Sequence, residues 1–240
     1  MGNNLNTGFY KDLDTNFEQA LEMSEREFSH EELLEMLKTG NIPQKQIAAL
    51  RLDSITSFEE SEILIANLTG CDGKIREAVA LKINQLLIQN SEVAKHFTQA
   101  KTFADASIDI NANICRLVID SVGILKNNNN FADVYLYNIL KFIKESFEEL
   151  DKFIFRDKKY VINKQLFKLY WCLEALKLFT DKIDSKILLP ILERASQERE
   201  YTIREKAAQI VVTQHKEEYN IIKTRLINDE NYYVRNVFNN

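Results

Sequence analysis

Hydrophobic and polar residues recur along this chain at the spacing of an α-helix. Two segments, Lys45–Thr56 and Arg76–Leu87, align without a gap, and their first residues lie 31 positions apart. In both segments apolar residues stand three, four, seven and about ten places after the first residue, which describes one face of a helix. The alternation expected of a strand is absent from them. The pattern therefore predicts two amphipathic helices of the same design.

Further copies of this pattern follow at irregular intervals and begin at Asn111, Asn163, Arg204 and Arg235. Upstream of each copy lies another apolar segment with helical spacing: 31–38, 57–68, 92–106, 131–155, 185–195 and 217–227. One such helix cannot bury its apolar face alone, whereas a stack of helix pairs can. The repetition therefore predicts an array of helical hairpins.

Three segments give the chain a resemblance to a known family. CDGKIREAVA (71–80), YTIREKAA (201–208) and LINDENYYVRNV (226–237) each bring Val or Ile and then Arg onto a helix, and the first and third open with a short turn. In these features the chain resembles the HEAT-repeat family over about residues 30–238. The resemblance implies an all-α fold, a right-handed α-solenoid of about six HEAT-like hairpins, of the same type as armadillo proteins.

The resemblance also implies a role for the basic residue that opens a copy. In HEAT repeats the corresponding Arg pairs with an acidic residue of the preceding turn. We therefore expect structural roles for the basic positions and for the two matching acidic ones: Lys45, Arg76, Arg204, Arg235, Asp72 and Asp229.

The N-terminal part differs from the rest in charge. Met1 to Gly40 holds nine acidic residues against three basic ones, and Phe17, Leu21 and Phe28 are spaced among the acidic positions. Terminal repeats need a polar outer cover. We therefore expect residues 1–28 to form an acidic capping helix, and residues 29–240 to form the repeat array of a single domain.

Composition and charge narrow the class of function. The net charge is −5, and outside the acidic N-terminal part the chain is close to neutral, so nucleic-acid binding is not favoured. Three cysteines far apart in sequence fit no disulfide framework, which favours a reducing, cytoplasmic location. No apolar run reaches the 18 residues that a membrane span requires.

No segment carries a recognisable catalytic or cofactor-binding motif. His30, His96 and His215 lie in three different repeat units, and none has a partner at metal-ligand spacing. We therefore expect no metal site, no cofactor and no enzymatic activity.

One stripe of residues suggests a binding site. Lys164, Lys168 and Trp171 follow i, i+4, i+7 spacing on a helix expected to line the concave face, with Arg116 beside Lys168 in the repeat register. Cations next to an aromatic ring suit an acidic peptide, a phosphate or a nucleic-acid base. The alternative is that Trp171 packs between helices while the lysines face water.

The function that these features favour is a noncatalytic scaffold or adaptor that binds another protein or a peptide through its concave face. A second hypothesis is a base-excision enzyme resembling the HEAT-fold DNA alkylation-repair glycosylases, in which Trp171 with Glu174, or Asp120 near Arg116, would act. A third is an accessory subunit resembling the HEAT-like lyases of phycobiliproteins. The short copy at Arg235 also leaves self-association open.

Overall fold

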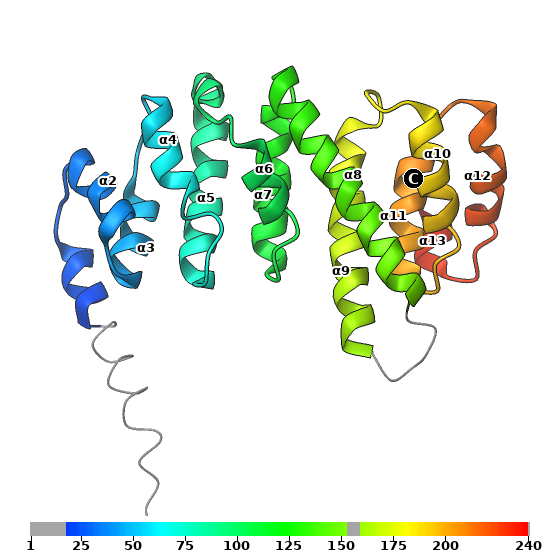
Figure 1. Ribbon diagram of the computed structural model, residues 1–240, viewed down its shortest axis with the longest axis horizontal. Coiled ribbons are helices and arrows are strands. Elements are labelled where there is room, and N and C mark those ends of the chain that lie inside the picture. The colour runs from blue at the N-terminus through cyan, green and yellow to red at the C-terminus, as the bar shows by residue number, and fades with distance from the viewer. Residues whose placement is uncertain (1–17, 153–158, 240) are drawn as a thin grey trace, which may run out of the picture. The chain divides into compact units, whose positions relative to one another are not determined.

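The computed structural model describes residues 18–152 and 159–239, and within these ranges every regular element is a helix (Figure 1). The predicted all-α fold is therefore confirmed. The chain divides into two compact units. Unit 1 comprises residues 1–106 and 111–131, and unit 2 comprises residues 107–110 and 132–240.

Unit 1 is a row of helical hairpins that follow one another in chain order, from blue to green in Figure 1. A helix over residues 18–25 precedes the labelled elements, which are α2 (His30–Thr39), α3 (Ile42–Arg51), α4 (Phe58–Ile65), α5 (Gly73–Gln89), η1 (Ser91–His96), α6 (Ala100–Ala106) and α7 (Ala112–Leu125). Helix α5 packs between α3 and α7, so the second helices of successive hairpins lie side by side.

Unit 2 repeats the arrangement with longer helices at its start. Its elements are α8 (Asn129–Lys152), which enters the unit at residue 132, α9 (Lys159–Leu176) with η3 (Lys177–Phe179), α10 (Ser185–Ala195), α11 (Tyr201–Val211), η4 (Glu217–Tyr219), α12 (Asn220–Ile227) and α13 (Tyr232–Asn236). Helix α11 packs between α9 and α13, which are the other second helices of this unit. We call the side formed by α9, α11 and α13 the second-helix face.

The predicted second helices are confirmed, because α3, α5, α7, α9, α11 and α13 contain or adjoin the residues at which the six copies begin. The predicted helix over 92–106 is instead two pieces, η1 and α6. Phe97 separates them with an extended backbone, and its side chain is fully buried, so core packing interrupts the helix there. The last three residues of the predicted helix over 131–155 lie outside the described residues.

Asp or Asn side chains start several second helices. Asp72 accepts hydrogen bonds from the backbone N–H groups of Lys74 and Ile75 at 2.9 and 3.0 Å, where α5 begins. The side chains of Asn111 and Asn231 cap the N-termini of α7 and α13 in the same way, by accepting a backbone N–H hydrogen bond. Each side chain satisfies N–H groups that have no partner within the helix. The turn residues of the repeat therefore fix where its second helix begins.

The core follows the predicted helix faces. In α5, Val79, Ala80, Ile83 and Leu86 are at most 3% exposed, as the repeat register predicts. In unit 2 the ring of Tyr135 lies 5.6 Å from that of Phe179, and both are fully buried. Each unit therefore has an apolar interior shared by neighbouring helices.

Residues 18–25 carry part of the predicted N-terminal cap. The guanidinium of Arg51 on α3 donates hydrogen bonds to the backbone carbonyls of Ser24 and Arg26, which ties this segment to the first hairpin. Leu21 remains 56% exposed. Phe17, the first apolar residue of the predicted cap, lies outside the described residues.

Candidate binding surface

The basic residues that open the copies bond to backbone and side-chain oxygens. In unit 1, Lys45 donates to the side-chain oxygen of Asn67 at 2.9 Å, which joins α3 to the next hairpin. Arg76 donates through Nη1 to the carbonyl of Gly70 at 2.6 Å, and the carboxylate of Asp72 caps α5. These side chains connect the repeat unit to its own turn and to the following one.

Of the basic residues that open the copies in unit 2, Arg204 makes more hydrogen bonds than Arg235. Nη1 of Arg204 donates to the carbonyls of Glu198 and Arg199 at 2.8 and 2.9 Å. Its Nε and Nη2 bind the two carboxylate oxygens of Asp229 at 2.7 and 3.0 Å. Asp229 belongs to the turn of the following hairpin, so the ion pair joins two successive hairpins.

This ion pair is buried, with side-chain exposures of 9% for Arg204 and 7% for Asp229. Burial by itself raises the pKa of the Asp229 carboxyl. Hydrogen bonds from Arg204 and from the backbone N–H of Asn231 outweigh that effect and leave the pKa below its ordinary value. The hydrogen bond to Asp229 raises the pKa of Arg204. Both groups are therefore held in their charged forms.

The four residues of the predicted binding stripe have different environments. Trp171 is only 7% exposed on α9. Lys168 binds a carboxylate oxygen of Glu145 on α8 at 3.1 Å, and its Nζ lies 4.5 Å from the ring centre of Phe142. Lys164 is exposed on α9. Within unit 2, the side chain of Lys168 is therefore directed to α8 rather than to the second-helix face.

Arg116 is an exposed side chain of α7 in unit 1, whereas Lys164, Lys168 and Trp171 belong to α9 in unit 2. A common site formed by all four stays a prediction.

The accessible stripe of α9 lies one residue earlier than the predicted one. It runs through Asn163, Phe167, Tyr170 and Glu174, which are exposed or half-buried. One residue corresponds to a rotation of about 100° around a helix axis. The aromatic residues Phe167 and Tyr170 were therefore missed by the sequence prediction, although their spacing from Asn163 is helical.

These aromatic residues line a pocket between α9 and the start of α11. It has a volume of about 330 Å³ and is lined by Asn163, Leu166, Phe167, Tyr170, Trp171, Glu200 and Thr202. The ring of Trp171 meets those of Phe167 and Tyr170 edge to face, with centres 6.2 and 5.1 Å apart. We call this the aromatic pocket. Because the three rings support one another, its wall is formed before any ligand arrives.

A cluster of paired charges adjoins the aromatic pocket on the same face. Glu174 accepts hydrogen bonds from Lys206 and, at 2.8 Å, from Lys177. Lys206 also lies 4.6 Å from the ring centre of Tyr170 and 3.2 Å from the side-chain oxygen of Gln209. We call this the Glu174 cluster.

The Glu174 cluster keeps its charges despite burial. Burial raises the pKa of Glu174, but the hydrogen bonds from Lys177 and Lys206 outweigh it and leave that pKa below its ordinary value. Burial lowers the pKa of Lys206, but its bond to Glu174 outweighs that effect and leaves the pKa raised. Fixed charges therefore stand beside an apolar pocket.

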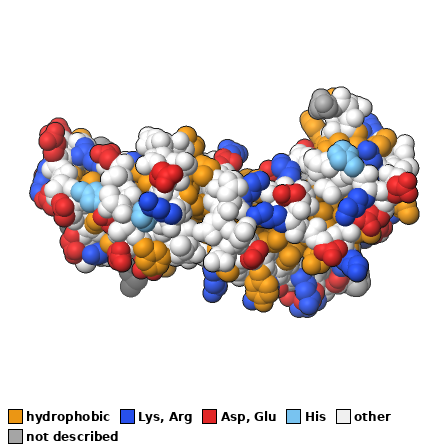
Figure 2. Space-filling view, turned by 90° about the horizontal axis from the view of Figure 1, so that it is seen from above, with side chains coloured by type: hydrophobic (Ala, Val, Ile, Leu, Met, Phe, Trp, Pro, Cys, Tyr) orange, Lys and Arg blue, Asp and Glu red, His pale blue; other side chains and the backbone are white. Residues whose placement is uncertain are grey.

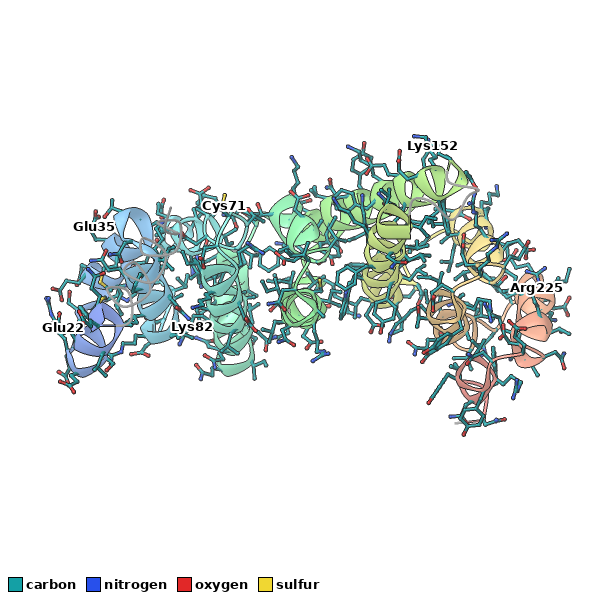
Figure 3. All side chains as sticks on the ribbon, turned by 90° about the horizontal axis from the view of Figure 1, so that it is seen from below. Glu22, Glu35, Cys71, Lys82, Lys152 and Arg225 are labelled. Atoms are coloured by element: carbon teal, nitrogen blue, oxygen red, sulfur yellow. The ribbon has the colours of Figure 1, made fainter. Side chains whose placement is uncertain are left out.

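In residues 18–152 and 159–239, no three or more His, Cys, Asp or Glu side chains come together as metal ligands. No helix in these ranges is both long and apolar enough to span a membrane. On the face shown in Figure 2, acidic and basic side chains are interspersed over each unit. Cys71, which Figure 3 labels, is exposed, whereas Cys115 and Cys172 are buried.

The described residues define an all-α protein built of successive helical hairpins, an architecture consistent with HEAT and armadillo repeats. No protein-family model matches the chain, and no curated protein matches it significantly.

The solved structures that are similar to this chain include the following two. An engineered protein is 12% identical, with 89% of this chain and 94% of that one covered and a TM-score of 0.48. A designed armadillo repeat protein is 9% identical, with 86% and 95% covered and a TM-score of 0.48. The architecture is defined by the helices of the chain itself.

Proposed function

We propose that this protein is a noncatalytic, cytoplasmic scaffold that binds a segment of another protein through the second-helix face of unit 2. The observation that carries the proposal is the aromatic pocket beside the Glu174 cluster. Aromatic residues are enriched at protein interfaces, and those that become buried at the centre of an interface contribute a large share of the binding energy.

The size and lining of the aromatic pocket support a side chain as its occupant. Its volume of about 330 Å³ is at the lower end of the range of ligand pockets, roughly 300–1,000 Å³. Phe167 is 36% exposed at its wall, and Asn163 and Thr202 supply polar groups at its edge. An apolar or aromatic side chain of a partner would cover Phe167, while these polar groups bond to the partner backbone.

The charges on this face favour a protein partner over a nucleic acid. Lys168, Lys177 and Lys206 are each bonded to a carboxylate, so none of them is free to neutralise a phosphate at no cost. Lys164 is an exposed cation of α9 and supports contact with one acidic residue of the partner. Arg116, on unit 1, stays a prediction as a second contact. Base excision and chromophore attachment stay predictions without a supporting observation.

Site-specific photocrosslinking tests this proposal. A photoreactive amino acid is placed at Phe167, at Ile187 and at Tyr137 in separate variants. Ile187 is 49% exposed in a competing apolar groove of about 410 Å³ between α8 and α10. Tyr137 is 69% exposed on α8 and lines neither site, so it is the matched control. We expect one protein to be crosslinked from position 167 and from neither of the others.

Binding of that protein, once purified, is then measured against substituted chains. Loss of a central aromatic contact costs 2 kcal/mol or more, so Phe167→Glu should weaken binding by about 30-fold or more. Tyr137→Glu, which adds the same charge to an exposed aromatic position, should change the dissociation constant less than about threefold. Crosslinking from Ile187 instead of Phe167, or equal affinity for both variants, would contradict the proposal.

A further inference from the structure

Two arginines in unit 2 are held by the same backbone contacts. Arg204 donates through Nη1 to the carbonyls of the residues six and five positions earlier. Arg235 does the same, with its Nη1 bonded to the carbonyls of Asp229 and Glu230 at 2.5 and 2.8 Å. The two guanidinium groups are therefore fixed in equivalent positions at the starts of α11 and α13.

The other edge of the guanidinium distinguishes the two residues. In Arg204, Nε and Nη2 bind the carboxylate of Asp229 from the following hairpin. In Arg235, Nε and Nη2 have no hydrogen-bond or ion-pair partner among residues 18–152 and 159–239. An arginine fork held in place by its other nitrogen binds a carboxylate through two parallel hydrogen bonds. Arg235 therefore presents an unfilled carboxylate site.

The surface around Arg235 is uncovered in the same way. Tyr201, at the start of α11, is half-buried because Tyr233 of the next hairpin stacks on it, with ring centres 6.1 Å apart. At the start of α13, Tyr232 and Tyr233 are 62% and 60% exposed. Ile227 at the end of α12 is 43% exposed. Within residues 18–152 and 159–239, no hairpin makes at α13 the contacts that α13 makes at α11.

The surface around Arg235 also carries an acidic residue that could bind an arginine of a second copy. The side chain of Glu230 is 90% exposed, and its backbone carbonyl accepts from Arg235. The Glu230 carboxylate lies 3.5 Å from Nη2 of Arg204, the longest of the carboxylate contacts that Arg204 makes, and its exposure leaves it accessible to a second guanidinium. In a twofold contact, a residue i that contacts residue j of the other copy implies that j also contacts i, so one such contact gives two equivalent ion pairs. Such a contact would bring each open arginine against an exposed glutamate.

We propose that Ile227, Glu230, Tyr232, Tyr233 and Arg235 form a dimer contact, in which two copies of the chain pair through a twofold axis. Arg235 of each copy binds Glu230 of the other through Nε and Nη2. The tyrosines of the two copies pack around these ion pairs and exclude water from them. This proposal is independent of the aromatic pocket and of its partner.

Sedimentation velocity of the full chain, over a wide concentration range at low salt, tests the dimer. We expect a monomer–dimer equilibrium that Arg235→Glu and Glu230→Arg each weaken by tenfold or more, because each places like charges in contact. The double variant with both substitutions restores opposite charges in both pairs, and we expect it to regain dimerisation. Lys186→Glu, an exposed site on α10 with the same change in charge as Arg235→Glu, should have no effect.

Folding is checked separately, because Arg235→Glu also removes two bonds to carbonyls. Tyr232→Ser changes an exposed side chain only and should weaken the dimer in a chain of unchanged helicity. A wild-type chain that stays monomeric at every concentration would overturn the proposal. A double variant that stays as weak as the single ones would overturn the Arg235–Glu230 pairing. Open-ended growth with concentration would overturn the twofold arrangement.

Discussion

Asp229→Asn should lower the free energy of unfolding of unit 2 by about 3 kcal/mol at neutral pH. The substitution removes the negative charge that Nε and Nη2 of Arg204 bind. It leaves the guanidinium, which is 9% exposed, with only the exposed carboxylate of Glu230 at 3.5 Å. Breaking a buried ion pair by removing one partner costs about 3–5 kcal/mol. We expect the lower end of that range because Arg204 keeps its bonds to the carbonyls of Glu198 and Arg199.

The free energy of unfolding that Asp229→Asn removes should decrease as the pH falls. The pKa of Asp229 in the folded chain lies below its ordinary value of 3.8. A carboxyl with a lowered pKa contributes stability above the unfolded-state pKa, and that contribution disappears as the pH falls through the folded-state value. The difference between wild type and Asp229→Asn should therefore be constant near neutral pH and shrink below about pH 4.

Trp171 makes the measurement specific to unit 2. It is the one tryptophan of the chain, lies on α9 and is 7% exposed, so its emission shifts to longer wavelength when unit 2 unfolds. Urea titrations followed by this emission give the free energy of unfolding by linear extrapolation. Circular dichroism on the same samples shows whether unit 1 unfolds separately.

Glu230→Gln, compared at a chain concentration at which the proposed dimer is dissociated, is the matched control. It neutralises the adjacent carboxylate, which is 90% exposed and lies 3.5 Å from Arg204. An exposed pair of this kind is worth about 0–1 kcal/mol. A loss below about 1 kcal/mol for Asp229→Asn, or a loss that persists undiminished at acid pH, would refute the assigned role of the buried pair.

Three further predictions concern unit 1 and the thiols. Ser29→Ala removes the cap of α2 and should destabilise unit 1 by about 1 kcal/mol in thermal or urea unfolding. Burial lowers the pKa of Lys82, so Lys82→Met should be neutral or stabilising by up to about 1 kcal/mol, and the gain should vanish as alkaline pH deprotonates the lysine of the wild type. A maleimide should modify Cys71 in the native chain, whereas Cys115 and Cys172 should react only after unfolding, as measured by mass spectrometry.

The helical hairpins could be predicted from sequence because helix formation leaves a local, periodic pattern. Val79, Ile83 and Leu86 lie on the face that the register predicts, and each is buried against neighbouring helices. The side on which α9 is exposed could not be predicted in the same way. The exposed side depends on contacts with α8: Lys168 bonds to Glu145 and lies over the ring of Phe142, so its side chain points away from the second-helix face.

The partners of the repeat arginines also depend on packing between hairpins. The family resemblance implies pairing with an acidic residue of the preceding turn, and Arg235 does contact that turn, through the backbone carbonyl of Asp229. The carboxylate of Asp229 binds Arg204 of the previous hairpin instead. Sequence spacing identified Arg235 and Asp229, but it could not show which of two nearby arginines binds the Asp229 carboxylate. The packing of one hairpin on the next brings that carboxylate to Arg204. Arg225, labelled in Figure 3 on α12, similarly bonds back to Ser196 and Glu193 of the preceding hairpin.

The central claim, recognition of a protein segment at the aromatic pocket, is tested most directly by the indole N–H resonance of Trp171. This group lies in the pocket wall, is buried and donates no hydrogen bond within the described residues. We predict that the protein crosslinked from Phe167 shifts this resonance to saturation in the wild-type chain and leaves it unmoved in Phe167→Glu at the same concentration. A partner that binds both chains equally well and leaves the resonance of the wild type unchanged would contradict the account.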